Sequence, residues 1–95
     1  MIYNFQSVNF KVDNKLKFFV KNKTKKLEKF YKRILKIRVL FKIENTSSKI
    51  NKIVEFIVRI PGREIVVKNT TFSFEKSVNR SIKKAERILV KLKKK

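Results

Sequence analysis

The strongest constraint on the fold comes from residues 73–95, in which apolar and cationic side chains alternate with helical spacing. One face of a helical wheel repeats apolar residues at steps of three and four: Phe74, Val78, Ile82, Ala85, Leu89 and Leu92. The opposite face repeats cations at the same steps: Lys76, Arg80, Lys83, Lys84, Arg87, Lys91 and Lys94. The apolar face must pack against a core, and the cationic face must stay in water or meet an anion. We therefore predict a long final helix with Ser73 as its N-cap.

Residues 13–36 have the same two-sided pattern and predict an earlier long helix, with Asp13 as its N-cap. Its apolar stripe consists of Leu16, Phe19, Val20, Leu27, Phe30, Tyr31 and Ile34. The cations opposite or beside that stripe are Lys21, Lys25, Lys29 and Lys32, with Lys15, Lys26 and Arg33 on a flank. The chain thus offers two helices, each with one apolar face and one cationic face.

The segments before and between these helices alternate as strands do. The first ten residues alternate loosely, whereas residues 37–44 and 53–60 place every second apolar side chain on one side. A Pro61-Gly62 pair follows at the two central positions of a turn. This pair suits type II, because Pro presets the first φ angle and Gly permits the positive second one. Residues 64–69 form the last predicted strand.

These elements predict an α+β fold in a single domain, residues 1–95, with the order βαβββα. Because a helix joins the first two strands, we expect them to be parallel neighbours with a right-handed connection, followed by antiparallel strands. Both helices should share one face of the four-stranded mixed sheet, since each has one apolar stripe. The other face mixes apolar and charged residues and should be solvated: Leu40, Ile53 and Ile57 among Arg38, Lys42, Glu55 and Arg59.

The distribution of charge indicates the kind of partner. Lys and Arg total 27 against 7 Asp and Glu, which gives a net charge of +20. Of the 27 cations, 10 lie in residues 13–36 and 9 lie in residues 73–95. A generic basic protein would spread its charge more evenly. The concentration on two helices therefore indicates a polyanion, with RNA, DNA and an anionic membrane surface as candidates.

Residue types that support catalysis are missing or scarce. His and Cys are absent, which removes the commonest general base, the thiol nucleophile and the preferred zinc ligands. The carboxylates are at least nine positions apart along the chain, and one Gly cannot form a phosphate-binding glycine loop. We therefore expect no enzyme, and neither a cofactor, a metal nor a small-molecule substrate.

The sequence also lacks the patterns of membrane and secreted proteins. No apolar run reaches the roughly 18 residues of a transmembrane helix. The first residues have neither the positive start nor the apolar block of a signal peptide. With no Cys there is no disulfide framework, and we expect a cytoplasmic protein.

Two residues of the earlier helix depart from its pattern. Lys23 falls within the apolar arc, where its stem could pass core neighbours and present the ammonium at an edge. It is then either an adaptable rim residue, which we favour, or a lysine aimed at a phosphate. Phe18 falls among the lysines and should face solvent. It is either an isolated exposed ring, which we favour, or a platform for an unpaired base.

Short segments spread in order over nearly the whole chain match those of a known family. They are Phe19-Val20, Lys23, residues 26–30 (KLEKF), Ile34, Val39, residues 41–45 (FKIEN), 51–55 (NKIVE), 60–62 (IPG), 73–75 (SFE) and 84–87 (KAER). With these segments the sequence resembles the short form of the ribosome hibernation-promoting factor family, which includes the ribosome-associated translation inhibitors. The KLEKF segment and the closing Lys-x-x-Arg are the more specific parts.

The resemblance implies a domain that occupies the mRNA and tRNA path of the small ribosomal subunit. There it contacts small-subunit rRNA and keeps the ribosome idle during stress or stationary phase. In that family basic residues of both helices meet rRNA phosphates, and the matching positions here are Lys23, Lys26, Lys29, Lys84, Arg87 and Lys91. The stripe is extended in this chain by Lys76, Arg80 and Lys83. The dimerisation domain of the long form is absent from these 95 residues, so ribosome pairing would need a separate ribosome-dimerising factor.

Two other classes fit parts of the pattern. From the first helix onward, the order αβββα is that of a double-stranded-RNA-binding domain, and equal affinity for isolated duplexes and for ribosomes would favour it. A membrane-surface protein could use the cationic helices, and vesicle flotation would identify it. That class is weaker, because the apolar faces are needed for the core and are not available to insert.

Overall fold

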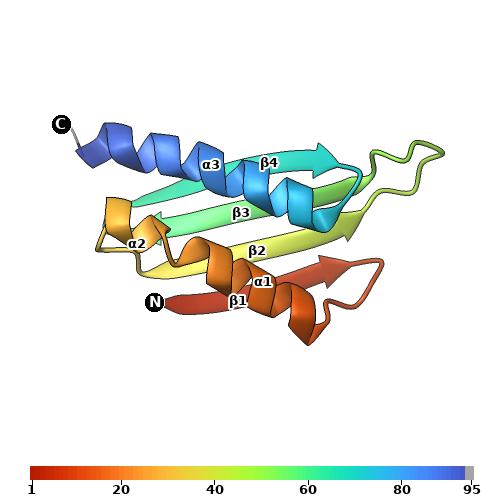
Figure 1. Cartoon of the computed structure of the whole chain (residues 1–95), viewed down its shortest axis with the longest axis horizontal. Coiled ribbons are helices and arrows are strands. Elements are labelled where there is room, and N and C mark those ends of the chain that lie inside the picture. The colour runs from red at the N-terminus through yellow and green to blue at the C-terminus, as the bar shows by residue number, and fades with distance from the viewer. Residues whose placement is uncertain (94–95) are drawn as a thin grey trace.

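Four strands and three helices make up residues 1–93, which the computed structural model describes. In chain order they are β1 (Ile2–Val8), α1 (Asn14–Thr24), α2 (Leu27–Phe30), β2 (Lys36–Ile43), β3 (Lys52–Ile60), β4 (Arg63–Thr71) and α3 (Phe74–Lys93). The sheet order is β1-β2-β3-β4, with β1 parallel to β2 and the other pairs antiparallel. All helices lie on one face of the sheet (Figure 1). The predicted α+β architecture and strand topology are confirmed.

Alternation along the strands decides which side chains form the core. The side chains of the two central strands that have no exposed surface are Ile37, Val39, Phe41, Val54, Phe56 and Val58. Helix α3 covers β3 and β4 with its apolar stripe, and α1 and α2 contact α3 beside it. The residues between the buried ones point to the opposite face of the sheet, which none of the helices in residues 1–93 covers (Figure 1).

Aromatic rings close the end of the core where α1 and α3 begin. The ring of Phe41 in β2 meets the rings of Phe74 and Phe10 edge-on, with centroids 5.5 and 6.2 Å apart. Phe10 and Phe74 stack on each other at 4.6 Å. Such pairs add about 0.5–1.5 kcal/mol beyond the burial of their area. The cluster therefore ties β2 and the segment before α1 to the start of α3.

The predicted extent of the earlier helix, residues 13–36, is wrong, because α1 ends at Thr24. The buried Thr24 hydroxyl donates to the carbonyl of Val20 (2.8 Å), a local bond that tends to bend or weaken a helix. After it the chain tightens, and the amide of Glu28 donates to the carbonyl of Lys25 (3.3 Å), only three residues back. A helix of one turn, α2, follows this break.

Two further features oppose a continuous helix. Lysines recur at four-residue steps, where like charges repel: Lys17, Lys21, Lys25 and Lys29. Tyr31 then has extended backbone angles, and the amide of Leu35 donates to the carbonyl of Arg59 in β3 (2.8 Å). Ile34 is nevertheless buried and Tyr31 packs against the core. Leu27, Tyr31 and Ile34 were thus identified correctly as residues of the core or its rim, whereas Phe30 is only half-buried, and the helical period beyond Thr24 was wrong.

The predicted caps and turn are confirmed. The side chain of Asp13 accepts a hydrogen bond from the amide of Leu16 (2.8 Å), and the Ser73 hydroxyl accepts one from the amide of Lys76 (3.1 Å). Gly62 has a φ of 77°, as the second central position of a type II turn requires. These local bonds fix where α1 and α3 begin, and therefore which residues reach solvent along them.

Candidate nucleic-acid interface

Helix α3 is anchored to the sheet by polar contacts along its buried side. The Ser77 hydroxyl donates to the carbonyl of Lys52 (2.8 Å) and shares a hydrogen bond with the Thr71 hydroxyl (2.7 Å). The side-chain amide of Asn69 donates to the Ser81 hydroxyl (3.3 Å). The sequence analysis missed these serines, although their four-residue spacing beside the apolar stripe was visible. Together with the stripe, they fix the rotation of α3 about its axis and hold its cations away from the sheet.

The predicted cations of α3 lie on its outward side. Those with exposed side chains are Arg80, Lys83, Lys84, Arg87 and Lys91. Lys76 is half-buried, and its ammonium lies 4.6 Å from the centroid of the Phe72 ring, within cation–π range. Lys94, the last member of the predicted stripe, lies outside the described residues. The helix therefore presents a row of five exposed positive charges, with a sixth held by an aromatic ring.

The three predicted cations of the earlier helix come from three different pieces of chain. Lys23 belongs to α1, Lys26 lies in the break, and Lys29 belongs to α2. All three are exposed. The Lys23 ammonium lies over the ring of Phe19, 5.6 Å from its centroid. Although Lys23 was expected within the apolar arc, the buried residue at this point of the helix is its neighbour Thr24. Because α1 and α2 both contact α3 and the three helices lie on one face of the sheet, the segments that carry these cations lie on the same side of the sheet as α3 (Figure 1).

Phe18 is 71% exposed, as expected for a ring that falls among the lysines. The sequence analysis missed a second exposed ring, Phe72, which is 59% exposed and lies just before α3. Phe72 is one residue beyond β4, and its contact with Lys76 across the first turn of α3 could not be read from strand alternation. Of these two rings, Phe72 has a cation within cation–π range, and Phe18 is an exposed residue of α1.

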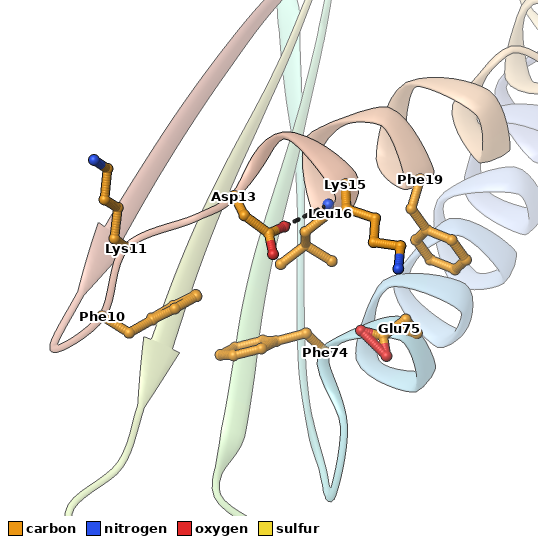
Figure 2. A pocket seen from close by; sticks show the side chains of 8 residues that line it. All are labelled: Phe10, Lys11, Asp13, Lys15, Leu16, Phe19, Phe74 and Glu75. Atoms are coloured by element: carbon orange, nitrogen blue, oxygen red, sulfur yellow. Dashed lines mark hydrogen bonds between the residues drawn. The ribbon is translucent and has the colours of Figure 1, made fainter.

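A groove of about 520 Å³ lies between the first turns of α1 and α3 (Figure 2). Its apolar lining comes from Phe10, Leu16, Phe19 and Phe74, and its charged lining from Lys11, Asp13, Lys15 and Glu75. Figure 2 shows side chains from the two helices and from the segment before α1 facing this space. The Lys15 side chain adds positive charge between the helices, whereas that of Lys11 extends away from the groove (Figure 2). Neither lysine was among the predicted site residues. Asp13 and Glu75 offset that charge, so the groove is less cationic than the outward side of α3.

The arrangement can bind an extended anion through its solvent-exposed lysine and arginine side chains. Within residues 1–93, no group of three or more His, Cys, Asp or Glu side chains is placed to hold a metal ion. None of the helices in that part of the chain combines the length and apolar character needed to cross a membrane. A row of exposed cations favours phosphate contacts, which supply affinity and little sequence information.

Tyr3 gives a test of the contact between β1 and α1. Its hydroxyl shares a hydrogen bond with Thr24 (2.6 Å), and burial raises its pKa above 10.0. The negative charge of Glu28 adds to the rise, whereas the Thr24 hydroxyl limits it because it can turn toward a phenolate. The folded state thus resists ionisation, so the stability that Tyr3 contributes is present below pH ~10 and is lost as pH rises through its folded pKa. Chemical denaturation from pH 8 to 11 should show the free-energy difference between wild type and Tyr3→Phe shrinking or reversing above pH ~10.

The comparison with Tyr3→Phe isolates the effect of the phenol, since the two proteins are otherwise identical in sequence. A difference that stays constant over this range would show that the phenol is not buried against α1.

Comparison with known proteins identifies the family. The family described as sigma 54 modulation protein / S30EA ribosomal protein matches residues 3–95. A ribosomal subunit interface protein from Coxiella burnetii has a similar structure, with a TM-score of 0.81 and 26% sequence identity over 100% of both chains. The N-terminal domain of Protein Y from Thermus thermophilus shares the fold, with a TM-score of 0.83 and 16% identity over 96% of this chain and 97% of the other. No curated protein matches the chain. The match over residues 3–95 confirms the resemblance seen in the sequence, and the chain belongs to the sigma 54 modulation protein / S30EA ribosomal protein family.

Proposed function

We propose that this protein is a cytoplasmic ribosome hibernation factor. It binds rRNA in the mRNA and tRNA path of the small ribosomal subunit and keeps idle ribosomes translationally inactive. Pairing of idle ribosomes would need a separate ribosome-dimerising factor. The observation that carries the proposal is the row of exposed cations along α3, together with the exposed Lys23, Lys26 and Lys29 on α1, on α2 and in the break between these two helices, which both contact α3.

Three features support an RNA partner of defined shape. The helices expose cations on the side away from the sheet, while their apolar faces are buried in the core and cannot enter a lipid surface. Phosphate contacts do not read sequence, so a rigid domain gains specificity by fitting a structured RNA. The solved structure from Coxiella burnetii is described as a ribosomal subunit interface protein, and the present chain matches it from end to end.

Competition on purified small subunits tests the proposal directly. The protein should cosediment with small subunits near 0.15 M salt, and added mRNA with initiator tRNA should displace it, because the proposed site overlaps their path. In a cell-free translation reaction, the protein should lower product yield when it is added before mRNA.

Cosedimentation that is insensitive to mRNA and tRNA would contradict the proposed location. Equal affinity for a synthetic RNA duplex and for small subunits would instead favour a free-standing double-stranded-RNA-binding module. Sucrose-gradient profiles of cells with and without the protein would then show whether idle ribosomes accumulate as single particles or as pairs.

A further inference from the structure

The face of the sheet that carries no helix has its own group of positive charges. Lys36 and Arg38 alternate with buried Ile37 along β2, so both point to this open face. In the register of β2 and β3, Lys36 lies directly opposite Arg59, and Arg38 lies opposite Ile57. Arg38 and Arg59 are therefore diagonal neighbours. We call Lys36, Arg38 and Arg59 the strand cluster.

The strand cluster surrounds a shallow depression of about 150 Å³. Ile57 and Glu64 complete its lining, and Glu64 lies opposite Arg59 in the register of β3 and β4. Lys36 and Arg38 are half-buried, so neither of these long side chains extends fully into water. Three cations therefore face a single carboxylate around one hollow.

Such a cluster works against folding when no ligand is present. Like charges directly opposite each other on neighbouring strands are destabilising. The Lys36–Arg59 pair is of this kind, and Arg38 adds a third charge on the diagonal. An anion in the depression would offset this repulsion. A guanidinium suits a phosphate, because its planar fork can donate two parallel hydrogen bonds to phosphate oxygens.

We propose that the strand cluster binds the phosphate backbone of a second RNA segment, on the side of the protein opposite the helices. This inference rests on the proposed function, because it names a second contact with the same rRNA. The molecule measures 20 Å along its shortest axis, so a domain of this thickness can touch RNA on two sides of a channel at once. We favour RNA over an acidic protein as the ligand of the strand cluster, because a domain bound to rRNA through its helices already has RNA close to it.

Amide chemical shifts on the full chain, labelled with ¹⁵N, test the inference with a synthetic RNA stem-loop as the probe. RNA should shift amides of α1 and α3 and also those around Lys36, Arg38 and Arg59. In Lys36→Gln/Arg38→Gln the shifts at the sheet should disappear while those at the helices remain. The matched control is Lys42→Gln/Lys68→Gln, which removes two charges from the same face outside the depression and should keep both sets.

Cosedimentation with small subunits gives a second readout. Removing Lys36 and Arg38 should lower the slope of log affinity against log salt by up to ~1.8, at ~0.9 for each duplex-like phosphate contact. The variant should also unfold at a higher temperature than wild type at low salt, because the repulsion between Lys36 and Arg59 is gone. A variant that binds weakly because it is misfolded would unfold at a lower temperature instead.

The outcomes separate this inference from the proposed function. Shifts at the helices alone, with wild-type affinity of Lys36→Gln/Arg38→Gln for small subunits, would overturn the second contact and leave the proposed function intact. Shifts at the strand cluster with a poly-glutamate peptide, but not with RNA, would overturn it in favour of an acidic protein partner. Absence of small-subunit binding by the wild-type protein would overturn both.

Discussion

Neutralising Lys84, Arg87 and Lys91 together should weaken association with the small ribosomal subunit by roughly 100-fold at 0.15 M salt. The estimate follows from counterion release, in which each duplex-like phosphate contact contributes a slope of ~0.9 in log affinity against log salt. Three lost contacts lower that slope by up to ~2.7. All three side chains are exposed on the outward side of α3, so substitution by Gln leaves the core untouched. Cosedimentation at several salt concentrations measures both effects.

The control must remove the same number of charges elsewhere, because net charge alone changes non-specific attraction to RNA. Lys49→Gln/Arg63→Gln/Lys68→Gln meets this requirement, since all three side chains are exposed and none belongs to a helix or to the strand cluster. This control should bind within a few-fold of wild type. Equal losses in the two triple variants would show that α3 acts only through the total charge of the protein.

Replacing Phe41 by Ala should give the largest loss of stability, about 3–5 kcal/mol in the free energy of unfolding. Its side chain has no exposed surface, and its ring contacts those of Phe5, Phe10 and Phe74. A domain of this size has a total stability of roughly 5–14 kcal/mol, so the variant should be marginally folded near 37 °C. Denaturant unfolding followed by circular dichroism measures the change.

Phe72→Ala is the matched control, because it makes the same substitution at a ring that is 59% exposed and lies outside the core. Its loss should stay below about 1 kcal/mol. Similar losses for the two variants would contradict the assignment of Phe41 to the centre of the aromatic cluster. Phe41→Leu should lie between them, because it retains most of the apolar volume but loses the ring-to-ring contacts.

Periodicity determined most of this fold in advance. Alternation in β2 and β3 and the three-to-four spacing in α3 each leave only one face to bury. Together with the order of the elements along the chain, these faces were enough to predict the topology. The end of α1 could not be predicted in the same way. The apolar residues beyond Thr24 keep helical spacing, and neither Pro nor Gly marks the break. The Thr24 hydroxyl, which bonds back to Val20 and so weakens the helix at its end, also shares a hydrogen bond with Tyr3, and that contact depends on the position of β1.

The candidate site was predictable to the extent that it lies on regular structure. The outward cations of α3 followed from the helical wheel, and the structure places all the described ones as expected, apart from the half-buried Lys76. That Lys11 and Lys15 line a groove became apparent only when the starts of α1 and α3 were found side by side. The strand cluster was likewise invisible, because the opposition of Lys36 to Arg59 depends on the register between strands.

The interruption after Thr24 affects how long a stretch of RNA the protein can engage. A straight helix over the whole predicted span, residues 13–36, would be more than about 30 Å long. Its lysines would then be spread along this whole length. Instead α1 ends at Thr24, Lys26 lies in the break, and Lys29 belongs to the short helix α2, which contacts α3. Under the proposed function, the earlier cations therefore meet RNA as separate short groups on α1, the break and α2, and not as one continuous row.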